Sequence, residues 1–304
     1  MAPPQPLTQP MNRKLLINLL LLLVVAALGL FAWLEPGKEP ERLDRLTGRS
    51  PDGVQSLRIE HPDGRVLEFG QRGGGWHMLR PYDLPANRIR LTALARVVEA
   101  PIIGSFPLPK ENLAQFGLDK PIRLQVDNDS FLFGASNPVN NQRYVEHGGR
   151  LNLVIDRFYH HLGALPEQLL SPSLLPEGTR LKEIKVPQYR LYKTGMGWAM
   201  EPADPSLSPD DLNQRVQDWL RAQSLQIVAI DKVEGGEEVA LTLEGDRIDR
   251  FLIQKREGQI WLIEPDLKIG YLLPGGSDLL SPPGSGKPET AIPGTSPAPT
   301  PAAD

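Results

Sequence analysis

The fold is decided by residues 189–220, which read YRLYKTGMGWAMEPADPSLSPDDLNQRVQDWL. Alternating apolar and polar residues lead into a glycine bend at 195–197, and a second short apolar run carries Trp198. Ser208 then offers a helix N-cap, followed by a proline in the first turn and two aspartates at the positive end of the helix dipole. The stretch predicts two strands joined by a turn, then a helix with the apolar stripe Leu212, Val216, Trp219 and Leu220.

The same order of signals occurs earlier in the chain. An alternating run over 54–60, a turn at 61–64, a second run over 65–69 and the glycine bend 73–75 precede a strand with Trp76. A helix is expected from Ala86 to about Pro101. Four pairs of residues share one offset of 122: Trp76 and Trp198, Leu94 and Val216, Val97 and Trp219, and Val98 and Leu220. A constant offset through a helix indicates an internal repeat.

The later parts of the two halves also correspond. Alternating apolar residues at 122–126 match those at 239–243, and the pair Phe131 and Phe133 matches Phe251 and Ile253. Each unit is therefore expected to contain three strands, one helix and four further strands. We predict an α+β fold made of two similar repeats of mainly antiparallel sheet with one main helix each, over residues 51–175 and 176–280.

The N-terminal region is strongly apolar, because residues 15–34 read LLINLLLLLVVAALGLFAWL. Twenty helical residues span about 30 Å, the thickness of a hydrocarbon core. Arg13 and Lys14 precede the run, and such charges stay on the cytoplasmic side. We expect a single-pass transmembrane helix at 15–34 in a bacterial inner membrane. Residues 1–14 are then cytoplasmic, 35–50 form a linker, and the bulk of the chain is periplasmic.

A cleaved signal peptide is the alternative interpretation of this run. The run is longer than the 7–15 apolar residues of a signal core, and it continues through Phe31 and Trp33. The chain has no cysteine, which excludes a lipoprotein, disulfides and thiolate metal sites. Translation can start at Met1 or at Met11, which precedes Arg13 by two residues.

Composition restricts the class of partner. The chain of 304 residues has 33 basic and 37 acidic residues and a net charge of −4, so it has no overall basic field that attracts nucleic acid. The apolar share of 40% is that of a globular chain. Residues 281–304 are rich in proline and small residues and are expected to be a disordered tail.

The first half resembles a known family. Its most recognisable element is Phe116-Gly117-Leu118-Asp119-Lys120-Pro121, followed by a strand, Phe133-Gly134 and Arg143-Tyr144-Val145. Together with the Leu-rich anchor, Trp76, Pro81 and Pro85, these residues resemble the domain-of-unknown-function 4340 family over roughly residues 12–275. The resemblance implies an anchored bacterial protein, often encoded beside gliding-motility-type ABC transporter components, and it supplies no catalytic residues. The second half departs from the pattern, since nothing near 230–239 reproduces Gly117-Leu118-Asp119.

One cluster has the residue types of a metal site, namely His160 and His161 with Asp156. Adjacent histidines point about 100° apart on a helix, and no third ligand follows at a familiar spacing. We therefore interpret these residues as surface or loop-packing residues and predict no metal.

Five further motifs are also interpreted as structure. Gly73–Gly75 is a hairpin turn, 134–137 is not the Gly-x-Ser-x-Gly elbow of hydrolases, and prolines interrupt any calcium-loop spacing in 204–211. The polar loop 137–142 is interpreted as a turn, with a partner contact as the alternative. The tryptophans are assigned to core packing: Trp76, Trp198, Trp219 and Trp261. The sequence thus predicts no catalytic, cofactor-binding or metal-binding residue and no cofactor.

Two functions from different classes remain. The first is a non-enzymatic, membrane-anchored interaction module that serves an ABC-type transport or envelope complex, with the lipid bilayer and a membrane protein as partners. The second is an envelope hydrolase or carbohydrate-binding protein with a carboxylate site built from dispersed acids such as Asp119, Asp127 and Glu146. Paired buried carboxylates favour the second, and an exposed apolar patch without perturbed acids favours the first.

Overall fold

The computed structural model describes residues 13–34, 43–137, 140–276 and 278–284. The chain divides into two compact units, residues 1–44 and 45–304. The first unit contains the helix α1 (Arg13–Leu34). Among the side chains that are described, no helix combines the length and the apolar character needed to cross a membrane. The predicted segments 1–12, 35–42 and 285–304 lie outside the described residues.

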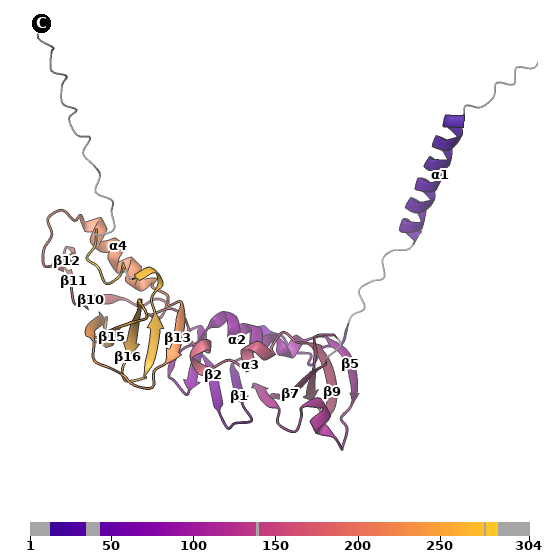
Figure 1. Ribbon diagram of the computed structural model, residues 1–304, viewed down its shortest axis with the longest axis horizontal. Helices are drawn as coiled ribbons and strands as arrows, with labels where there is room; N and C mark the ends of the chain where they lie inside the picture. The colour runs from indigo at the N-terminus through magenta and orange to yellow at the C-terminus, as the bar shows by residue number, and fades with distance from the viewer. Residues whose placement is uncertain (1–12, 35–42, 138–139, 277, 285–304) are drawn as a thin grey trace, which may run out of the picture. The chain divides into compact units, whose positions relative to one another are not determined.

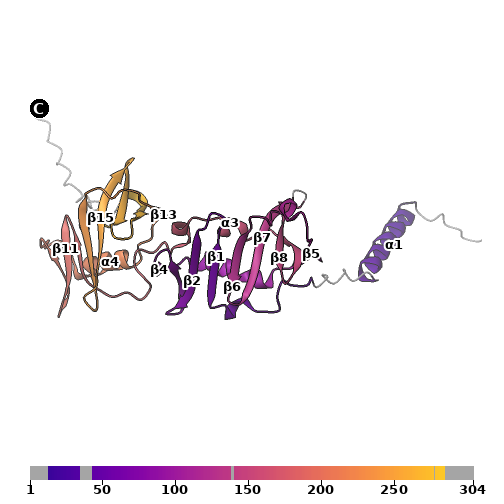
Figure 2. The same cartoon turned by 90° about the horizontal axis from the view of Figure 1, so that it is seen from below.

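The larger unit contains a first antiparallel sheet of nine strands in the order β4-β3-β2-β1-β6-β7-β8-β9-β5. Figure 2 shows its strands side by side. The bounds are β1 (Ser56–Glu60), β2 (Val66–Arg72), β3 (Gly75–Arg80), β4 (Leu84–Pro85), β5 (Ile102–Pro107), β6 (Ile122–Val126), β7 (Asp129–Asn137), β8 (Gln142–His147) and β9 (Arg150–Ile155).

A second antiparallel sheet has eight strands in the order β12-β11-β10-β14-β15-β16-β17-β13. Its strands are β10 (Leu181–Val186), β11 (Tyr189–Thr194), β12 (Gly197–Glu201), β13 (Gln226–Ala229), β14 (Glu237–Leu243), β15 (Ile248–Arg256), β16 (Gln259–Glu264) and β17 (Ile269–Leu272). The α+β class with antiparallel sheets is thereby confirmed.

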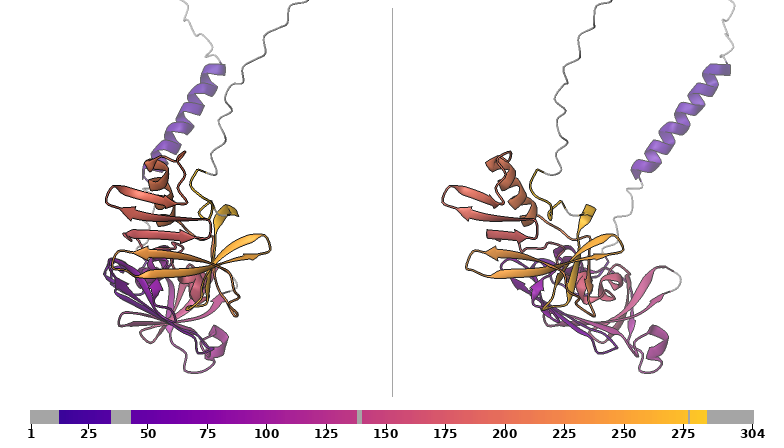
Figure 3. Two further views of the ribbon diagram at one scale, coloured as in Figure 1. Left: turned by 90° about the vertical axis from the view of Figure 1, so that its left-hand side faces the viewer. Right: turned by 60° about the vertical axis from the view of Figure 1, so that its left-hand side comes forward.

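The two sheets share one strand order apart from β4, the extra edge strand of the first. In the first sheet the chain leaves the edge strands β3 and β4, enters one helix, and returns to the opposite edge as β5. In the second sheet it leaves the edge strand β12, enters one helix, and returns to the opposite edge as β13. The helices are α2 (Arg88–Ala95), continued by η2 (Arg96–Glu99), and α4 (Pro209–Leu220). Figures 1 and 3 show α4 over one face of its sheet. The edge strands β5 and β13 were not predicted, because short runs bounded by prolines or polar residues look like loops.

The centre of each sheet has the same row of buried side chains. Ile59 of β1 lies opposite Leu67 on one neighbouring strand and Leu124 on the other. In the second sheet, Ile184 of β10 lies opposite Leu191 and Leu241 in the same way. All of these side chains are buried. The alternation noted in the sequence therefore directs one face of each sheet into a core.

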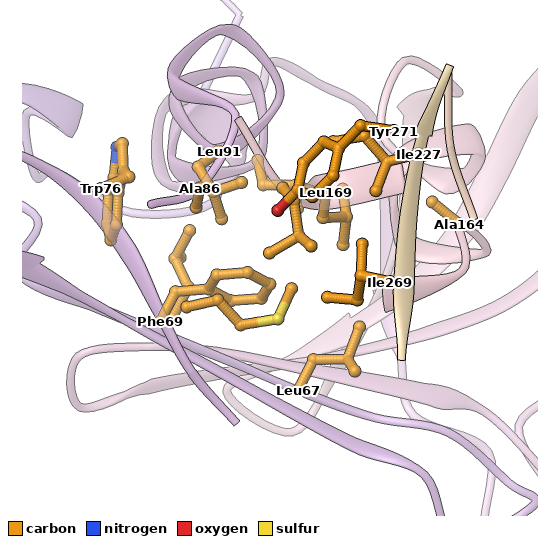
Figure 4. Close-up of a cluster of buried hydrophobic side chains, with 14 of the residues drawn as sticks. Leu67, Phe69, Trp76, Ala86, Leu91, Ala164, Leu169, Ile227, Ile269 and Tyr271 are labelled. Atoms are coloured by element: carbon orange, nitrogen blue, oxygen red, sulfur yellow. The ribbon is translucent and has the colours of Figure 1, made fainter. Parts of the chain in front are cut away.

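A single cluster of buried side chains contains residues from both sheets. Figure 4 shows where they meet, with these residues labelled: Leu67, Phe69, Trp76, Ala86, Leu91, Ala164, Leu169, Ile227, Ile269 and Tyr271. The strands β13 and β17 of the second sheet thus pack toward β2 and α2 of the first. The two sheets share one core.

Residues 164–175, which we call the strap, connect the two sheets. On the first sheet, the Asn87 N–H donates to the Leu169 carbonyl at 2.8 Å. The Tyr82 hydroxyl donates to the buried carboxylate of Glu167 at 2.6 Å. On the second sheet, the Leu174 N–H donates to the Ala222 carbonyl at 3.0 Å. The connection is therefore held on both sides. The strap contains the short helical turn η4 (Pro166–Leu169), and the turn α3 (Tyr159–Leu162) precedes it.

Both boundaries of the folded unit differ from the prediction. Leu46 is buried and its N–H donates to the Ala100 carbonyl, so residues 45–50 belong to the folded unit and not to a linker. At the other end, Pro283 is buried. Packing thus extends into the first four residues of the expected tail.

Trp219 of α4 is fully buried, as its place in the apolar stripe predicts. Its indole N–H donates to the Tyr189 hydroxyl at 2.9 Å, and that hydroxyl donates to the Leu279 carbonyl at 2.6 Å. Burial raises the pKa of Tyr189 to about 12, so the hydroxyl keeps its proton and remains a donor. The helix, the strand β11 and the C-terminal segment are joined at this point.

Replacing Trp219 with alanine should lower the free energy of unfolding by about 3–5 kcal/mol, because it opens a large cavity and leaves the Tyr189 hydroxyl without its donor. Urea unfolding of the two chains measures this. Met196→Ala, at a fully exposed apolar residue, is the control and should change stability by less than about 0.5 kcal/mol. A loss below about 1 kcal/mol for Trp219→Ala contradicts the packing described.

Candidate functional site: the signature loop and the bulge of β7

The three acids considered from the sequence are not brought together. Asp119 is exposed before β6, and Asp127 lies in the turn after it. The five residues of β6 separate them by about 17 Å. Glu146 of β8 accepts a hydrogen bond from the Gly149 N–H at 3.0 Å and so stabilises a turn. No shared carboxylate site arises from these residues.

Asp127 has a structural role. It has a positive φ of 51°, and its carboxylate accepts hydrogen bonds from the backbone N–H groups of Gln55 and Ser56 at 3.0 and 2.9 Å. Arg49 pairs with it at 2.6 Å. Burial raises its pKa, but Arg49 and the two N–H groups outweigh burial and lower it. The carboxylate stays ionised and ties the start of the folded unit to the β6–β7 turn.

The histidine pair His160 and His161 lies in the helical turn α3. Burial, then His160 and Arg90, lowers the pKa of His161 to about 4, so its ring is neutral. Asp156 is bound to Arg143 at 2.8 Å. Among the described residues, no group of three or more ligating side chains could hold a metal ion.

The remaining motifs take structural places. Gly73 and Gly74 have φ of 56° and 82° in the β2–β3 hairpin, conformations that glycine adopts without strain. Asn137 lies opposite Gln142 at the end of the β7–β8 hairpin, and residues 138–139 lie outside the described part. In 204–211, the Asp204 carboxylate accepts a hydrogen bond from the Ser206 hydroxyl, and Ser208 caps α4 while its hydroxyl donates to Asp211. Trp76, Trp219 and Trp261 are buried and Trp198 is partly buried.

The signature residues 116–118 pack directly on β7. Gly117 has a φ of 65°, and a Cβ atom there would lie 2.6 Å from the Ala135 backbone nitrogen. A Cβ atom on Gly134 would overlap the Phe116 carbonyl oxygen. Both positions therefore need glycine, because two backbone segments touch without room for a side chain. Phe116 completes the contact with an edge-on aromatic pair to Tyr144 at 5.0 Å.

This contact coincides with a bulge in β7. The register with β8 shifts between Phe133 and Ser136, which leaves the Gly134 carbonyl outside the regular ladder. Arg143, only 8% exposed, donates to that carbonyl at 2.5 Å. Residues that are 27 positions apart in the sequence, 116 and 143, thus meet at one irregularity of the sheet.

Arg143 is held from three sides. Besides the Gly134 carbonyl, its guanidinium binds Asp156 through both Nε and Nη2 at 2.8 Å. It also lies over the Tyr159 ring, 3.5 Å from the centroid. A buried charge needs such compensation. Sequence analysis singled out these residues, but it did not predict that Asp156 pairs with Arg143.

The second half has a counterpart that the sequence comparison did not find. A Cβ atom on Gly236 would overlap the Ile253 carbonyl oxygen of β15, the strand that corresponds to β7. Gln254 of β15 is 7% exposed and donates to the Glu234 carbonyl of the adjacent loop at 2.7 Å. The signal available in the sequence is the pair Gly235-Gly236 before a strand. Loop and strand touch in both halves, with different side chains.

A further carboxylate cluster lies in the second sheet, and sequence analysis missed it. Glu264 of β16 lies near Asp249, Asp266 and Tyr271. Burial, then the Asp249 and Asp266 carboxylates, raises the pKa of Glu264 to about 7, while Arg247 and a hydrogen bond with Tyr271 act in the opposite direction. An acid that holds its proton near neutral pH has the property of a general acid. Tyr271 itself is buried in the shared core.

Comparison with known proteins gives one match. The family model for the domain of unknown function DUF4340 matches residues 76–257, more than half of the chain. The matched range begins at Trp76 and contains the signature loop, the β7 bulge, Arg143 and the strap. No curated protein and no solved structure matches the chain.

Gly134→Ala should lower the free energy of unfolding by about 1–3 kcal/mol, because the new methyl group overlaps the Phe116 carbonyl and forces the loop from the strand. Chemical denaturation measures the loss. Gly75→Ala is the matched control, since a Cβ atom there meets nothing within 4 Å. Equal effects of the two substitutions would argue against a close contact between loop and strand.

Glu264→Gln tests the raised pKa. The folded chain holds this proton at pH values where the unfolded chain, with the ordinary value of 4.5, has released it. The contribution of Glu264 to the free energy of unfolding therefore falls as pH rises from about 4.5 to about 7, and stays constant above. The free energy of unfolding of the variant, measured relative to that of the natural chain, should therefore rise by about 1–2 kcal/mol from pH 5 to pH 8.

Unfolding free energies of both chains at the two pH values give this difference. Glu177→Gln, at an exposed glutamate, is the control. A difference that does not depend on pH for Glu264→Gln would show that its carboxyl is not perturbed.

Proposed function

The chain belongs to the DUF4340 family, and we propose that it is a membrane-anchored interaction protein of the bacterial envelope without catalysis of its own. In this proposal α1 spans the inner membrane once, the N-terminus is cytoplasmic and the unit of residues 45–304 is periplasmic. Its partner is a membrane transport or envelope complex, of the ABC type that the family resemblance implies. The observation that carries the proposal is a long apolar helix joined to one compact unit of two sheets.

The anchor is supported by the chemistry of α1. The helix has 22 residues, and Arg13 and Lys14 are its only charged residues. Its large side chains are exposed, with Leu22 71% and Val25 62% accessible. Leaving such a helix in water is unfavourable, whereas a bilayer buries all of its faces at once. The two charges at its start set the orientation.

The two sheets are proposed to be copies of one unit. The shared strand order, the matching central rows and the helix between opposite edges support this. Duplication gives the anchored protein two similar bodies joined by a common core. It therefore presents a larger rigid surface to a partner than one sheet does.

The contact with the partner is proposed at an exposed sheet edge. Of the described strands, only β11 pairs with β12, so one side of the β12 backbone is available for strand addition. Its register with β11 is continuous, and it contains no proline. The opposite edge of the first sheet is less suited, because β5 has a register shift after Ile102 and ends at Pro107.

An envelope hydrolase or carbohydrate-binding protein is the second candidate. The cluster of Glu264 with Asp249 and Asp266 favours it, since a carboxyl group with a raised pKa beside a second carboxyl group is typical of glycoside hydrolase sites. The acid would be Glu264. Turnover of an envelope polysaccharide by the purified full chain, abolished by Glu264→Gln in a protein that still folds, would establish this candidate in place of the first.

The anchored state predicts where the chain is found. The full chain should stay with membranes in alkaline carbonate and leave them only with detergent, and alkaline phosphatase fused after Ser50 should be active. Leu22→Arg with Val25→Arg should move the chain to the soluble fraction, since each arginine at the centre of a bilayer helix costs about 2.5–3.5 kcal/mol. Membrane proteins that co-purify with the natural chain should not co-purify with this double-arginine variant.

Leu22→Ala with Val25→Ala is the matched control, because it removes side-chain volume without adding charge, and it should remain anchored. A natural chain that carbonate releases, or an inactive phosphatase with an active cytoplasmic reporter at the same position, contradicts the anchor. An anchored chain that purifies without any membrane protein contradicts the partner.

A further inference from the structure

The helices α2 and α4 occupy the same place in their sheets but expose opposite chemistry. The outward side chains of α4 are acidic or uncharged: Asp210, Asn213, Gln214 and Gln217 are exposed. Those of α2 and its continuation are basic and apolar: Arg88, Ile89, Thr92 and Arg96 are exposed. Shared architecture does not require this difference. It has to come from what each helix faces.

The exposed side chains of α2 form one face. Residues 88, 89, 92 and 96 fall within about 100° around the helix axis, and the buried Leu94 lies opposite them. Ile89 is 80% exposed, although it stands beside a well-packed core. Among the described residues, Arg88 forms no ion pair. We call Arg88, Ile89, Thr92 and Arg96 the basic face.

Arginines outnumber acids around the basic face. The helical turn α3 packs against α2 (Figure 1), and the exposed Arg157 lies two residues before α3 in the chain. Three acids lie in the same region: Asp156 pairs with Arg143, Glu99 pairs with Arg45 and with Arg96 of the basic face, and Glu167 accepts a hydrogen bond from the neutral Tyr82 hydroxyl. Six arginines stand against these three acids: Arg45, Arg88, Arg90, Arg96, Arg143 and Arg157. A local positive field results in a chain whose net charge is −4.

The basic face lies next to the point where the chain enters the folded unit. The Leu46 N–H donates to the Ala100 carbonyl at 3.0 Å and the Thr47 N–H to the Val98 carbonyl at 2.9 Å, directly after the helical turn η2. Eleven residues, 35–45, lie between Leu46 and the end of α1. Eleven residues reach at most about 40 Å. If α1 spans the bilayer, the basic face is therefore held within reach of the lipid headgroups.

We propose that the basic face of α2 lies on the anionic phospholipid headgroups of the membrane that anchors the chain. This inference rests on the proposed anchor. Arginines bind phosphate groups, and an exposed isoleucine beside them suits the boundary between headgroups and acyl chains. The same surface repels the acidic helix α4, so we expect contact through α2 and not through α4. The folded unit thus has a fixed side toward the membrane and leaves the second sheet for the partner.

The full chain, which lacks cysteine, allows a direct test. Thr92→Cys and, at the matching position 122 residues later, Gln214→Cys each accept one fluorescent label. The labelled chains are reconstituted in vesicles of phosphatidylcholine, with or without phosphatidylglycerol, that contain a lipid with a quencher on its headgroup. We expect the label at 92 to be quenched at least twofold more than the label at 214 in phosphatidylglycerol vesicles. The difference should shrink in pure phosphatidylcholine and at 0.5 M NaCl.

Charge variants separate the basic face from a general effect of charge. Arg88→Gln with Arg96→Gln should abolish most of the quenching at position 92. Arg180→Gln with Arg250→Gln removes the same charge from two exposed arginines of the second sheet region and should leave it unchanged. Equal quenching at 92 and 214, or quenching at 92 that ignores both phosphatidylglycerol and the arginines, overturns the proposal. Protection of position 92 only when a co-purified protein is present would assign the face to a protein instead.

Failure of the anchor is recognised separately. A chain that does not stay with the vesicles in carbonate contradicts the proposed function before any label is read. Vesicles added to that chain from outside still test the inference, because quenching of the label at position 92 either increases with phosphatidylglycerol or does not.

Discussion

Everything in the folded unit depends on burying one face of each sheet beneath a helix that runs between opposite edges. Sheets with alternating side chains present a row of apolar residues, here centred on Ile59 and Ile184, that cannot remain in water. Because the chain leaves one edge and re-enters at the other, the helix is forced across that row. Trp219 and the corresponding Val97 are buried at the crossing. The signature loop, the strap and the position of the basic face all follow from this path.

Much of the fold could be predicted from the sequence, since periodicity and repetition are local properties. The alternation of β1, β2, β10 and β11, the N-cap at Ser208 and the constant offset of 122 fix the class and most elements. The edge strands β5 and β13 could not be recognised, because their pairing partners β9 and β17 lie far along the chain. What makes them strands is a hydrogen-bond ladder with a distant segment.

The candidate sites were less predictable for the same reason. Gly117 and Gly134 were recognised as parts of a motif, but the contact between their backbones, and the capture of the Gly134 carbonyl by Arg143, depend on a bulge that no short pattern encodes. Asp156 was interpreted as a surface or loop-packing residue, whereas it is the counter-charge of the buried Arg143. The raised pKa of Glu264 arises from burial beside Asp249, 15 residues earlier, which only the sheet register brings near.

The strap has a mechanical consequence. In the described chain it is the covalent route from the first sheet to the second, and its hydrogen bonds to Asn87 and Ala222 lie on either side of that route. A pull exerted on the second sheet is therefore carried to the tether through these few backbone bonds and the side chains packed around Leu169 and Tyr271. The force is thus shared by the hydrogen bonds and packed side chains of the strap, and it does not act on the covalent connection alone. The two sheets therefore transmit such a pull as one body.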